Sequence, residues 1–313
     1  MAKRLAEAVP GNFPVFVKPN AGLPRADGSG YDITPQLFAL QMKPYRELHL
    51  FAAGGCCGTT PEFIKLLNGT FAGCTPGRPA HRMPSVLCTP VDTVTVDGIT
   101  VVGERINPTG KKRFQQALRE GDMNYVLEQA VSQVEAGAQI LDVNVGAPGV
   151  DEPALMEQVV KALQSVVSLP LQLDSSHAEA LERGLRVYNG KPIVNSADAG
   201  SRISYIDLAA ANDAICVALC SADGIAKDNE ERMMHCHHML ERGMSLGMEA
   251  TDLWFDPLFL VVKGMQDKQM QVLECIKMFS DMGLNSTGGL SNNSNGMPKA
   301  IRPIMDSALV AMA

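Results

Sequence analysis

The sequence has 313 residues, enough for about two average domains, although a single β/α barrel alone takes about 250. Its hydrophobic fraction of 46% and charged fraction of 19% are ordinary for a globular protein, and its longest apolar runs, such as residues 258–262, are far shorter than the ~20 residues that cross a bilayer, which argues against a membrane protein. The 27 basic and 34 acidic residues leave a net charge of −7 without a dense Lys/Arg stripe, which argues against nucleic acid as a partner.

The N-terminus and the cysteines indicate a reducing compartment. Residues 1–10 include Glu7 and lack the apolar run of a secretory signal. The eight cysteines are too sparse for a disulfide scaffold. We therefore expect a cytoplasmic protein.

The first part of the chain is too short for a barrel of its own. Strands are predicted over residues 13–18 and 47–53, with a helix around residues 35–42 between them. Glycine and proline then accumulate between residues 68 and 90, which is typical of an irregular linker. We expect an N-terminal segment over residues 1–67, a linker over 68–97 and a main domain over 98–313.

In the main domain, apolar or β-branched runs alternate with helical patterns. A strand is predicted over residues 98–103, and a helix over 122–136 with Asp122 as its cap. A strand over residues 139–145 and a helix over 151–166, capped by Asp151, follow. Further strands, each followed by a helical stretch, are predicted over residues 169–174, 192–195, 214–219, 252–256 and 284–290.

Seven such β/α units predict an α/β fold with a parallel sheet covered by helices. An eight-fold TIM barrel and a doubly wound sheet both fit this alternation. Seven units are one short of a closed barrel, and an open barrel would expose strand edges.

Carboxylates and carboxamides stand where most of the predicted strands end, and in parallel β/α proteins the chemistry lies at these ends. They are Glu104, Asn107, Asp142, Asn144, Asp174, Asn195, Asp256 and Asn292. Each one alone is typical of a helix cap or a turn. Together they predict a pocket for a neutral heterocycle rich in N–H donors, because carboxylates accept such donors in pairs and Asn offers both a donor and an acceptor.

The stretches that carry these residues resemble a known family. The segments VGERINPTGKK, ILDVNVGAPGVDE, LQLDSSHAEALERGL, KPIVNS, WFDPL and GGLSN look like the pterin-binding domain of cobalamin-dependent methionine synthases and related methyltetrahydrofolate:corrinoid methyltransferases. Upstream, FVKPNAGLP and GGCCGTTPEFI resemble the end of the homocysteine-binding, zinc-carrying domain of the same family. The resemblance implies a (β/α)8 TIM barrel without its last β/α unit, preceded by part of a homocysteine-binding barrel.

The resemblance also implies a reaction and residue roles. The chain would bind 5-methyltetrahydrofolate and transfer its methyl group to a corrinoid during methionine synthesis. Asp174, Asn195 and Asp256 would hydrogen-bond the pterin ring, and Asn292 would approach N5. The remaining residues at the strand ends, Glu104, Asn107, Asp142 and Asn144, would surround them or contact the far side of the pterin. Because no DxHxxG motif is present, cobalamin would come from another domain or protein.

The sequence departs from the family at its zinc site. Cys56 and Cys57 match two zinc-binding cysteines, whereas the first ligand would lie before Met1. Since zinc sites use at least three protein ligands, we expect neither zinc binding nor homocysteine methylation from this chain alone. Cys74, Cys88 and His81 are further ligand candidates without supporting spacing.

The sequence also departs from the family at its C-terminal end. The chain stops after the seventh strand and its helix, so it is a fragment or its open barrel is covered by something else. Lys299 and Arg302 are the nearest basic candidates for the folate tail.

Two alternative functions stay open: a catalytically silent, truncated folate-binding remnant, and dihydropteroate synthase, which needs basic side chains around a diphosphate.

The GERINPTGKK segment lacks the spacing of a phosphate-binding P-loop. The cluster His235, Cys236, His237 and His238 predicts a solvated helix face, and Cys216 and Cys220 predict buried packing. The expected partners are a folate and a corrinoid carrier, and assembly as a homodimer is left open.

Overall fold

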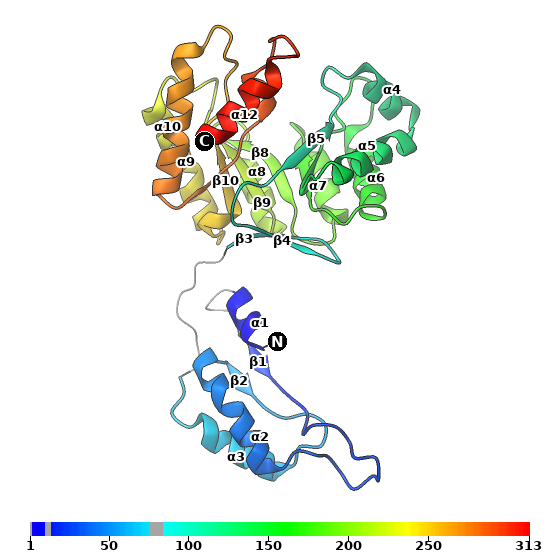
Figure 1. The fold of residues 1–313 in the computed structure, drawn as a ribbon, viewed down its shortest axis with the longest axis vertical. Helices are drawn as coiled ribbons and strands as arrows, with labels where there is room; N and C mark the ends of the chain where they lie inside the picture. The colour runs from blue at the N-terminus through cyan, green and yellow to red at the C-terminus, as the bar shows by residue number, and fades with distance from the viewer. Residues whose placement is uncertain (1, 10–13, 76–83) are drawn as a thin grey trace. The chain divides into compact units, whose positions relative to one another are not determined.

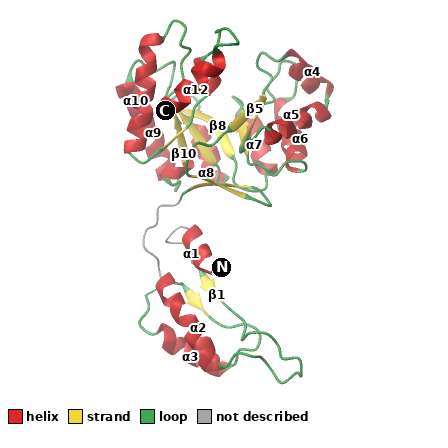
Figure 2. Cartoon of the chain, in the orientation of Figure 1, coloured by secondary structure: helices red, strands yellow, loops and turns green. Residues whose placement is uncertain are grey.

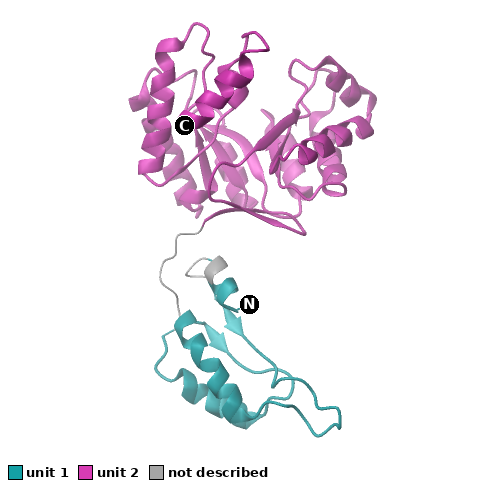
Figure 3. Cartoon of the chain, viewed as in Figure 1, with its two compact units in different colours: residues 1–83 teal, residues 84–313 magenta. Residues whose placement is uncertain are grey.

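The computed structural model describes residues 2–9, 14–75 and 84–313. The chain divides into two compact units, residues Met1–Met83 and Pro84–Ala313 (Figure 3). Each unit has its own apolar core, and each is described by itself. No helix within the described ranges is long and apolar enough to cross a membrane.

The first unit is a small α/β segment. Its elements are α1 (Ala2–Ala8), β1 (Phe16–Val17), α2 (Pro35–Met42), η1 (Lys43–Leu48), β2 (Ala52–Ala53) and α3 (Pro61–Phe71). Strands β1 and β2 pair in parallel. Helices α2 and α3 pack through Phe38, Met42, Phe63 and Leu67, with the two phenyl rings edge to face at 5.4 Å.

The predicted helix over residues 35–42 is confirmed, because Thr34 caps it and Pro35 occupies its first turn. The strand expected over 47–53 is wrong in its first half. Residues 43–48 form a 3-10 helix that ends at His49, whose φ of 46° turns the backbone into the left-handed region before β2.

The second unit begins with an antiparallel hairpin of β3 (Ser85–Cys88) and β4 (Thr93–Val96). This hairpin, together with the last residues of α3, lies inside the stretch 68–97 that we expected to be an irregular linker. The glycines and prolines that suggested a linker lie mainly before and between these elements. The alternation of Thr and Val over residues 93–96 is the signal that indicates a strand.

Seven parallel strands form the main sheet, and the predicted α/β fold is confirmed. They are β5 (Val102–Ile106), β6 (Ile140–Val143), β7 (Leu171–Asp174), β8 (Ile193–Asp198), β9 (Ile215–Leu219), β10 (Leu253–Asp256) and β11 (Asn285–Ser286). The strands lie side by side in chain order, so the sheet runs from β5 at one edge to β11 at the other. Figure 2 shows the sheet curled, with helices on its outer face.

The first predicted strand of this sheet is displaced. We expected residues 98–103, whereas β5 begins at Val102 and includes Glu104 and Arg105. Strand β5 is an edge strand, and edge strands tolerate charged side chains that a buried strand excludes. The apolar residue Ile99 is instead 79% exposed.

The helices follow the strands as the alternation predicted (Figure 1). They are α4 (Lys112–Glu120), α5 (Met123–Glu135), α6 (Glu152–Gln164), α7 (Ala178–Val187), α8 (Ser204–Ala211), α9 (Asn229–Ser245), α10 (Gln269–Asp281), α11 (Leu290–Asn293) and α12 (Arg302–Met312), with short 3-10 turns η2 (Ala250–Asp252) and η3 (Gln266–Lys268). The predicted caps are confirmed: Asp122 accepts from the Tyr125 amide and Asp151 from the Ala154 amide.

The concave side of the curled sheet has an apolar floor. Leu87, Ile140, Ile193, Ile215, Val217 and Trp254 form this cluster. The Trp254 indole donates to Ser85 Oγ at 2.8 Å, which ties β10 to the hairpin. The polar residues Asp174, Asp198 and Asp256 each end a strand.

Candidate functional site

A cavity of about 900 Å³ extends along the concave side of the sheet to the carboxyl ends of its strands. Seven of the eight residues predicted from the strand ends line it: Glu104, Asn107, Asp142, Asp174, Asn195, Asp256 and Asn292. The eighth, Asn144, lines a neighbouring cavity and contacts Asp174. The structure therefore brings the predicted residues together, because parallel strands end at the same edge of a sheet.

Asp142 is the most enclosed of the predicted side chains, with 5% exposure. Its Oδ1 accepts from Gln172 Nε2 at 2.7 Å and from Asn195 Nδ2 at 3.2 Å. Burial raises the pKa of Asp142 to about 7, and the nearby charge of Asp174 acts in the same direction. A carboxyl with this pKa can act as either hydrogen-bond acceptor or donor near neutral pH.

Gln172 is a cavity residue that the sequence reasoning missed. It belongs to the buried run of β7, and its position two residues before Asp174 places both side chains on the concave face. A polar residue on the inner face of an otherwise apolar strand is the signal that could have found it.

Asp174 and Asn144 form a pair across neighbouring strands. Asn144 Nδ2 donates to Asp174 Oδ2 at 3.0 Å, and Asn144 Oδ1 accepts from the Gly146 amide at 2.9 Å. Burial raises the pKa of Asp174, while the bond from Asn144 opposes that rise. The hydrogen bond from Asn144 therefore holds the Asp174 carboxylate in a fixed orientation at the cavity.

Asp256 ends β10 and is held by the turn that follows it. Its Oδ1 accepts from the Leu258 amide at 2.7 Å. Burial raises the pKa of Asp256 to about 6, against the lowering effect of this bond. Leu258 has a φ of 68°, a left-handed conformation that is uncommon for leucine.

Glu104 and Asn292 come from the two ends of the sheet. Glu104 Oε2 accepts from Ser291 Oγ at 3.1 Å, so a side chain on the edge strand β5 contacts helix α11, which follows the other edge strand β11. Asn292, the next residue, is exposed at the cavity wall. Gly288, in the segment before α11, lies against the ring of Phe259, where an added Cβ would clash.

Helix α12 supplies a further wall of the cavity that the sequence did not predict. Its residues Asp306, Leu309 and Val310 line the cavity, as does Ala313 directly after it. Asp306 Oδ2 accepts from Ser294 Oγ at 3.0 Å. Of the basic residues expected near a folate tail, Arg302 donates to Ser294 Oγ at 3.1 Å and Lys299 is exposed.

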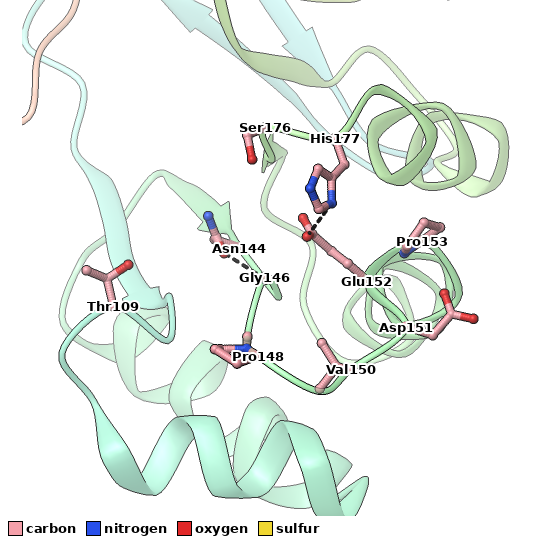
Figure 4. A pocket seen from close by; sticks show the side chains of 11 residues that line it. Thr109, Asn144, Gly146, Pro148, Val150, Asp151, Glu152, Pro153, Ser176 and His177 are labelled. Carbon is pink, nitrogen blue, oxygen red and sulfur yellow. Dashed lines mark hydrogen bonds and ion pairs between the residues drawn. The ribbon is translucent and has the colours of Figure 1, made fainter.

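A second cavity of about 520 Å³ opens beside Asn144, between the loops that follow β6 and β7 (Figure 4). His177 Nδ1 lies 2.9 Å from Glu152 Oε2, and Ser175 Oγ donates to the other oxygen of Glu152. All of these residues come from helix starts or the loops before them. Sequence reasoning identified Asp151 here as a cap and missed the contact between Glu152 and His177.

The cysteine pair of the first unit does not form a metal site with other described residues. Cys56 and Cys57 are exposed, with their sulfur atoms 4.0 Å apart. No group of three or more His, Cys, Asp or Glu side chains suited to a metal occurs within residues 2–9, 14–75 and 84–313. The candidate His81 lies outside the described residues. Among the described residues, the two thiolates by themselves do not make up the three protein ligands that a zinc site uses.

The expected solvated face on residues 235–238 is corrected in part. His235 and Cys236 are buried, whereas His237 and His238 are exposed. Helix α9 packs on the sheet through positions spaced three or four residues apart, which include both buried residues. Cys216 and Cys220 are buried as predicted.

The comparisons with known proteins agree with this geometry. Residues 103–313 match the family described as "Pterin binding enzyme", and residues 1–71 match the family described as "Homocysteine S-methyltransferase". The chain therefore belongs to the pterin binding enzyme family, whose match covers most of its length.

Among curated proteins, the chain is similar to the methionine synthases of Mycobacterium tuberculosis (strain ATCC 25618 / H37Rv) and Mycobacterium leprae (strain TN). It is 30% identical to the first over 319 residues and 29% identical to the second over 324 residues. Each alignment covers 95% of this chain but 27% of the relative, so the chain spans about a quarter of the length of these proteins. The resemblance seen in the motifs is thus confirmed over nearly the whole chain.

Among solved structures, the fold is similar to that of dihydropteroate synthases. One such enzyme with a bound product aligns at a TM-score of 0.57 and 19% identity, covering 73% of this chain and 89% of that one. The Yersinia pestis enzyme aligns at a TM-score of 0.56 and 18% identity, covering 73% and 87%. At this identity the likeness shows the fold, and it supports the barrel-type interpretation of the curled sheet.

Proposed function

We propose that this chain binds 5-methyltetrahydrofolate by its pterin ring and takes part in transferring the methyl group to a corrinoid during methionine synthesis. The observation that carries the proposal is the cavity at the strand ends, where carboxylates and carboxamides from six strands or the loops after them converge. The similarity to methionine synthases supports the folate and the reaction class.

The cavity suits the amidine-like edge of a pterin. Asp174 and Asp256 offer carboxylate oxygens that accept N–H groups, and Asn195 offers both a donor and an acceptor. Each of these side chains is held by a neighbour or lies on a strand of the sheet, so little conformational entropy is lost when a ring binds. Asp142 and Gln172 also line this cavity and are joined by a hydrogen bond from Gln172 Nε2 to Asp142 Oδ1.

Asn292 is the residue that we assign to the chemical step. A tertiary amine is a poor leaving group, so N5 needs a hydrogen bond or a proton as its bond to the methyl group breaks. A carboxamide that donates more strongly at that moment stabilises the transition state over the ground state. The corrinoid, supplied by another domain or protein, would provide the nucleophile that accepts the methyl group.

The rival reaction of dihydropteroate synthase is less compatible with this cavity. That reaction expels diphosphate and needs cationic side chains around it. No lysine or arginine lines the larger cavity in the part of the chain that the structure describes. The fold alone therefore does not favour this second function.

We also propose a cytoplasmic location, because the eight cysteines are free and scattered. Homocysteine methylation by this chain alone is not proposed, since Cys56 and Cys57 lack a third ligand among the described residues.

The test is a calorimetric titration of the full chain with 5-methyltetrahydrofolate, followed by reduced cobalamin while the cobalt spectrum is recorded. Saturable binding with conversion to the methylated spectrum supports the proposal. The Asp174→Ala variant should bind at least about tenfold more weakly, as expected for the loss of hydrogen bonds to a charged group. The matched control is Asp281→Ala, at an exposed carboxylate on α10.

Absence of binding in a folded sample would contradict the proposal and favour a silent remnant. Binding without conversion would retain the folate site and reject methyl transfer to free cobalamin.

A further inference from the structure

Arg232 on α9 is completely buried, which is unusual for an arginine. Its Nε donates to the Pro257 carbonyl at 3.0 Å and its Nη1 donates to Asn229 Oδ1 at 2.9 Å. Its Nη2 is buried without a hydrogen-bond partner, and within the described ranges it forms no ion pair with a carboxylate. Burying a charge in this way is costly, so the position calls for a specific reason.

The reason lies in the segment that carries Asp256. Three successive carbonyls at the end of β10 are held from three different elements. The Thr287 amide, after β11, donates to Phe255 O at 3.0 Å, and the Cys220 amide, after β9, donates to Asp256 O at 2.8 Å. Arg232 Nε then holds Pro257 O. The Asp256 carbonyl is thus the last of the three that accepts from a backbone amide, and the Pro257 carbonyl accepts from a side chain instead.

The Pro257 carbonyl needs a side-chain donor because the chain turns sharply at this point. Pro257 has no amide hydrogen to donate, and Leu258 adopts a φ of 68°. The turn directs the Leu258 amide onto Asp256 Oδ1 at 2.7 Å. With Oδ1 occupied, the other oxygen of Asp256 is left for the cavity.

We infer that Arg232 is a positioning residue for Asp256: its guanidinium fixes the Pro257 carbonyl, which holds the turn that aims the Asp256 carboxylate into the cavity. The planar guanidinium presents several donors in a rigid arrangement, so it can bond Pro257 and Asn229 at once. The link to ligand binding rests on the proposed function, whereas the link to Asp256 rests on these contacts alone.

The experiment compares Arg232→Met and Arg232→Lys with Arg242→Met in the full chain. Arg242 lies on the same helix but is exposed and paired with Asp207, so its substitution is a matched control. The readouts are the titration of the Asp256 carboxyl carbon by NMR, the dissociation constant for 5-methyltetrahydrofolate and the thermal midpoint.

We expect Arg232→Met to raise the pKa of Asp256 above its value of about 6, because a loosened turn weakens the Leu258 bond that lowers it. The dissociation constant should rise about tenfold, the change expected when one charged hydrogen-bonding group is misplaced. Arg232→Lys keeps a charged donor group but loses the planar guanidinium that reaches Pro257 and Asn229 together, so both quantities should fall between those of Arg232→Met and wild type. The control should change neither quantity.

An unchanged Asp256 titration and an unchanged affinity in a folded Arg232→Met protein would overturn the inference, even if the thermal midpoint falls. Where the Met variant does not fold, Arg232→Lys decides by the same two readouts. If the wild-type chain binds no folate, the proposed function fails, and the NMR titration still decides whether Arg232 positions Asp256.

Discussion

Three carboxylates near the carboxyl ends of β6, β7 and β10, namely Asp142, Asp174 and Asp256, lie in surroundings that raise the pKa of each. Burial is the largest cause in all three, because removal from water disfavours the charged form. Each one nevertheless accepts at least one hydrogen bond from a side chain or an amide. Such a site is prepared for a ligand that brings N–H donors, since these would replace the lost water.

The first prediction at this scale concerns Asn292. Replacing it by alanine should lower the rate of methyl transfer about 100-fold, the scale seen when one transition-state donor is removed. The folate dissociation constant should change less than about threefold, because the bond to N5 strengthens only as the methyl group leaves. Single-turnover kinetics and calorimetry measure the two quantities. Asn295→Ala, at an exposed residue that does not line the cavity, is the control. Equal losses in rate and affinity would count against the assigned role.

The second prediction concerns pH. The pKa of Asp142 is raised from 3.8 to about 7 in the folded chain, so between these values the folded state retains a proton that the unfolded state has lost. Its contribution to stability is therefore present below about pH 4 and is lost as the pH rises through 7. Asp142→Asn removes this dependence while keeping an oxygen to accept from Gln172 and Asn195.

Thermal midpoints recorded from pH 5 to pH 8 test this directly. As the pH rises, the thermal midpoint of Asp142→Asn should increase relative to that of wild type, by about 2–4 °C for each kcal/mol of difference in unfolding free energy. Asp281→Asn, at an exposed position on α10, should show no such trend relative to wild type. A constant difference between Asp142→Asn and wild type across this range would refute the assignment.

At the scale of elements, the site depends on where each strand stops and how the next helix starts. Asp151 accepts from the Ala154 amide at 3.1 Å and begins α6, while its neighbour Glu152 contacts His177 at the start of α7. The loops that shape the second cavity are thus tied to two helix starts (Figure 4).

The third prediction follows from that cap. Asp151→Ala should lower the free energy of unfolding by about 1 kcal/mol, because one amide at the start of α6 loses its partner. Asp151→Asn should cost much less, since asparagine caps helices as well as aspartate does. Urea unfolding followed by circular dichroism measures both variants. If Ala and Asn were equally destabilising, the charge rather than the cap would matter.

At the scale of the whole molecule, the chain consists of two units with separate apolar cores. Phe38, Met42, Phe63 and Leu67 form a core within residues 1–83, while the sheet and its helices form the cores of residues 84–313. The described residues that line the two cavities belong to the second unit.

The fourth prediction is that residues 84–313, produced alone, will unfold cooperatively and bind 5-methyltetrahydrofolate with the affinity of the full chain. Circular dichroism and calorimetry are sufficient to test it. The residues that line the cavity lie between positions 96 and 313, all of which the shorter chain keeps, so we expect removal of residues 1–83 not to change binding. A folded second unit with weakened binding would show that residues 1–83 act on the site. Arg242→Met in the shortened chain serves as a reference for small changes in stability.

The sequence by itself determined the class of fold, the order of the elements and most of the side chains at the strand ends. Hydrophobic periodicity and helix caps are local properties, so Asp122 and Asp151 could be recognised as helix starts without a structure. Position at a strand end is also local, which is why Asp142, Asp174, Asn195 and Asp256 were found together.

Only the tertiary structure decided the contacts between elements far apart in the chain. Strand β5 could not be placed correctly because its charged residues are tolerated at a sheet edge, and edges are defined only when the strands assemble. Three hydrogen bonds join residues that are 25 to 187 positions apart in the chain. They connect Gln172 with Asp142, Ser291 with Glu104, and Arg232 with the Pro257 carbonyl. The burial that raises the pKa of the three carboxylates arises in the same way, because packing removes their water only after the strands and helices have come together.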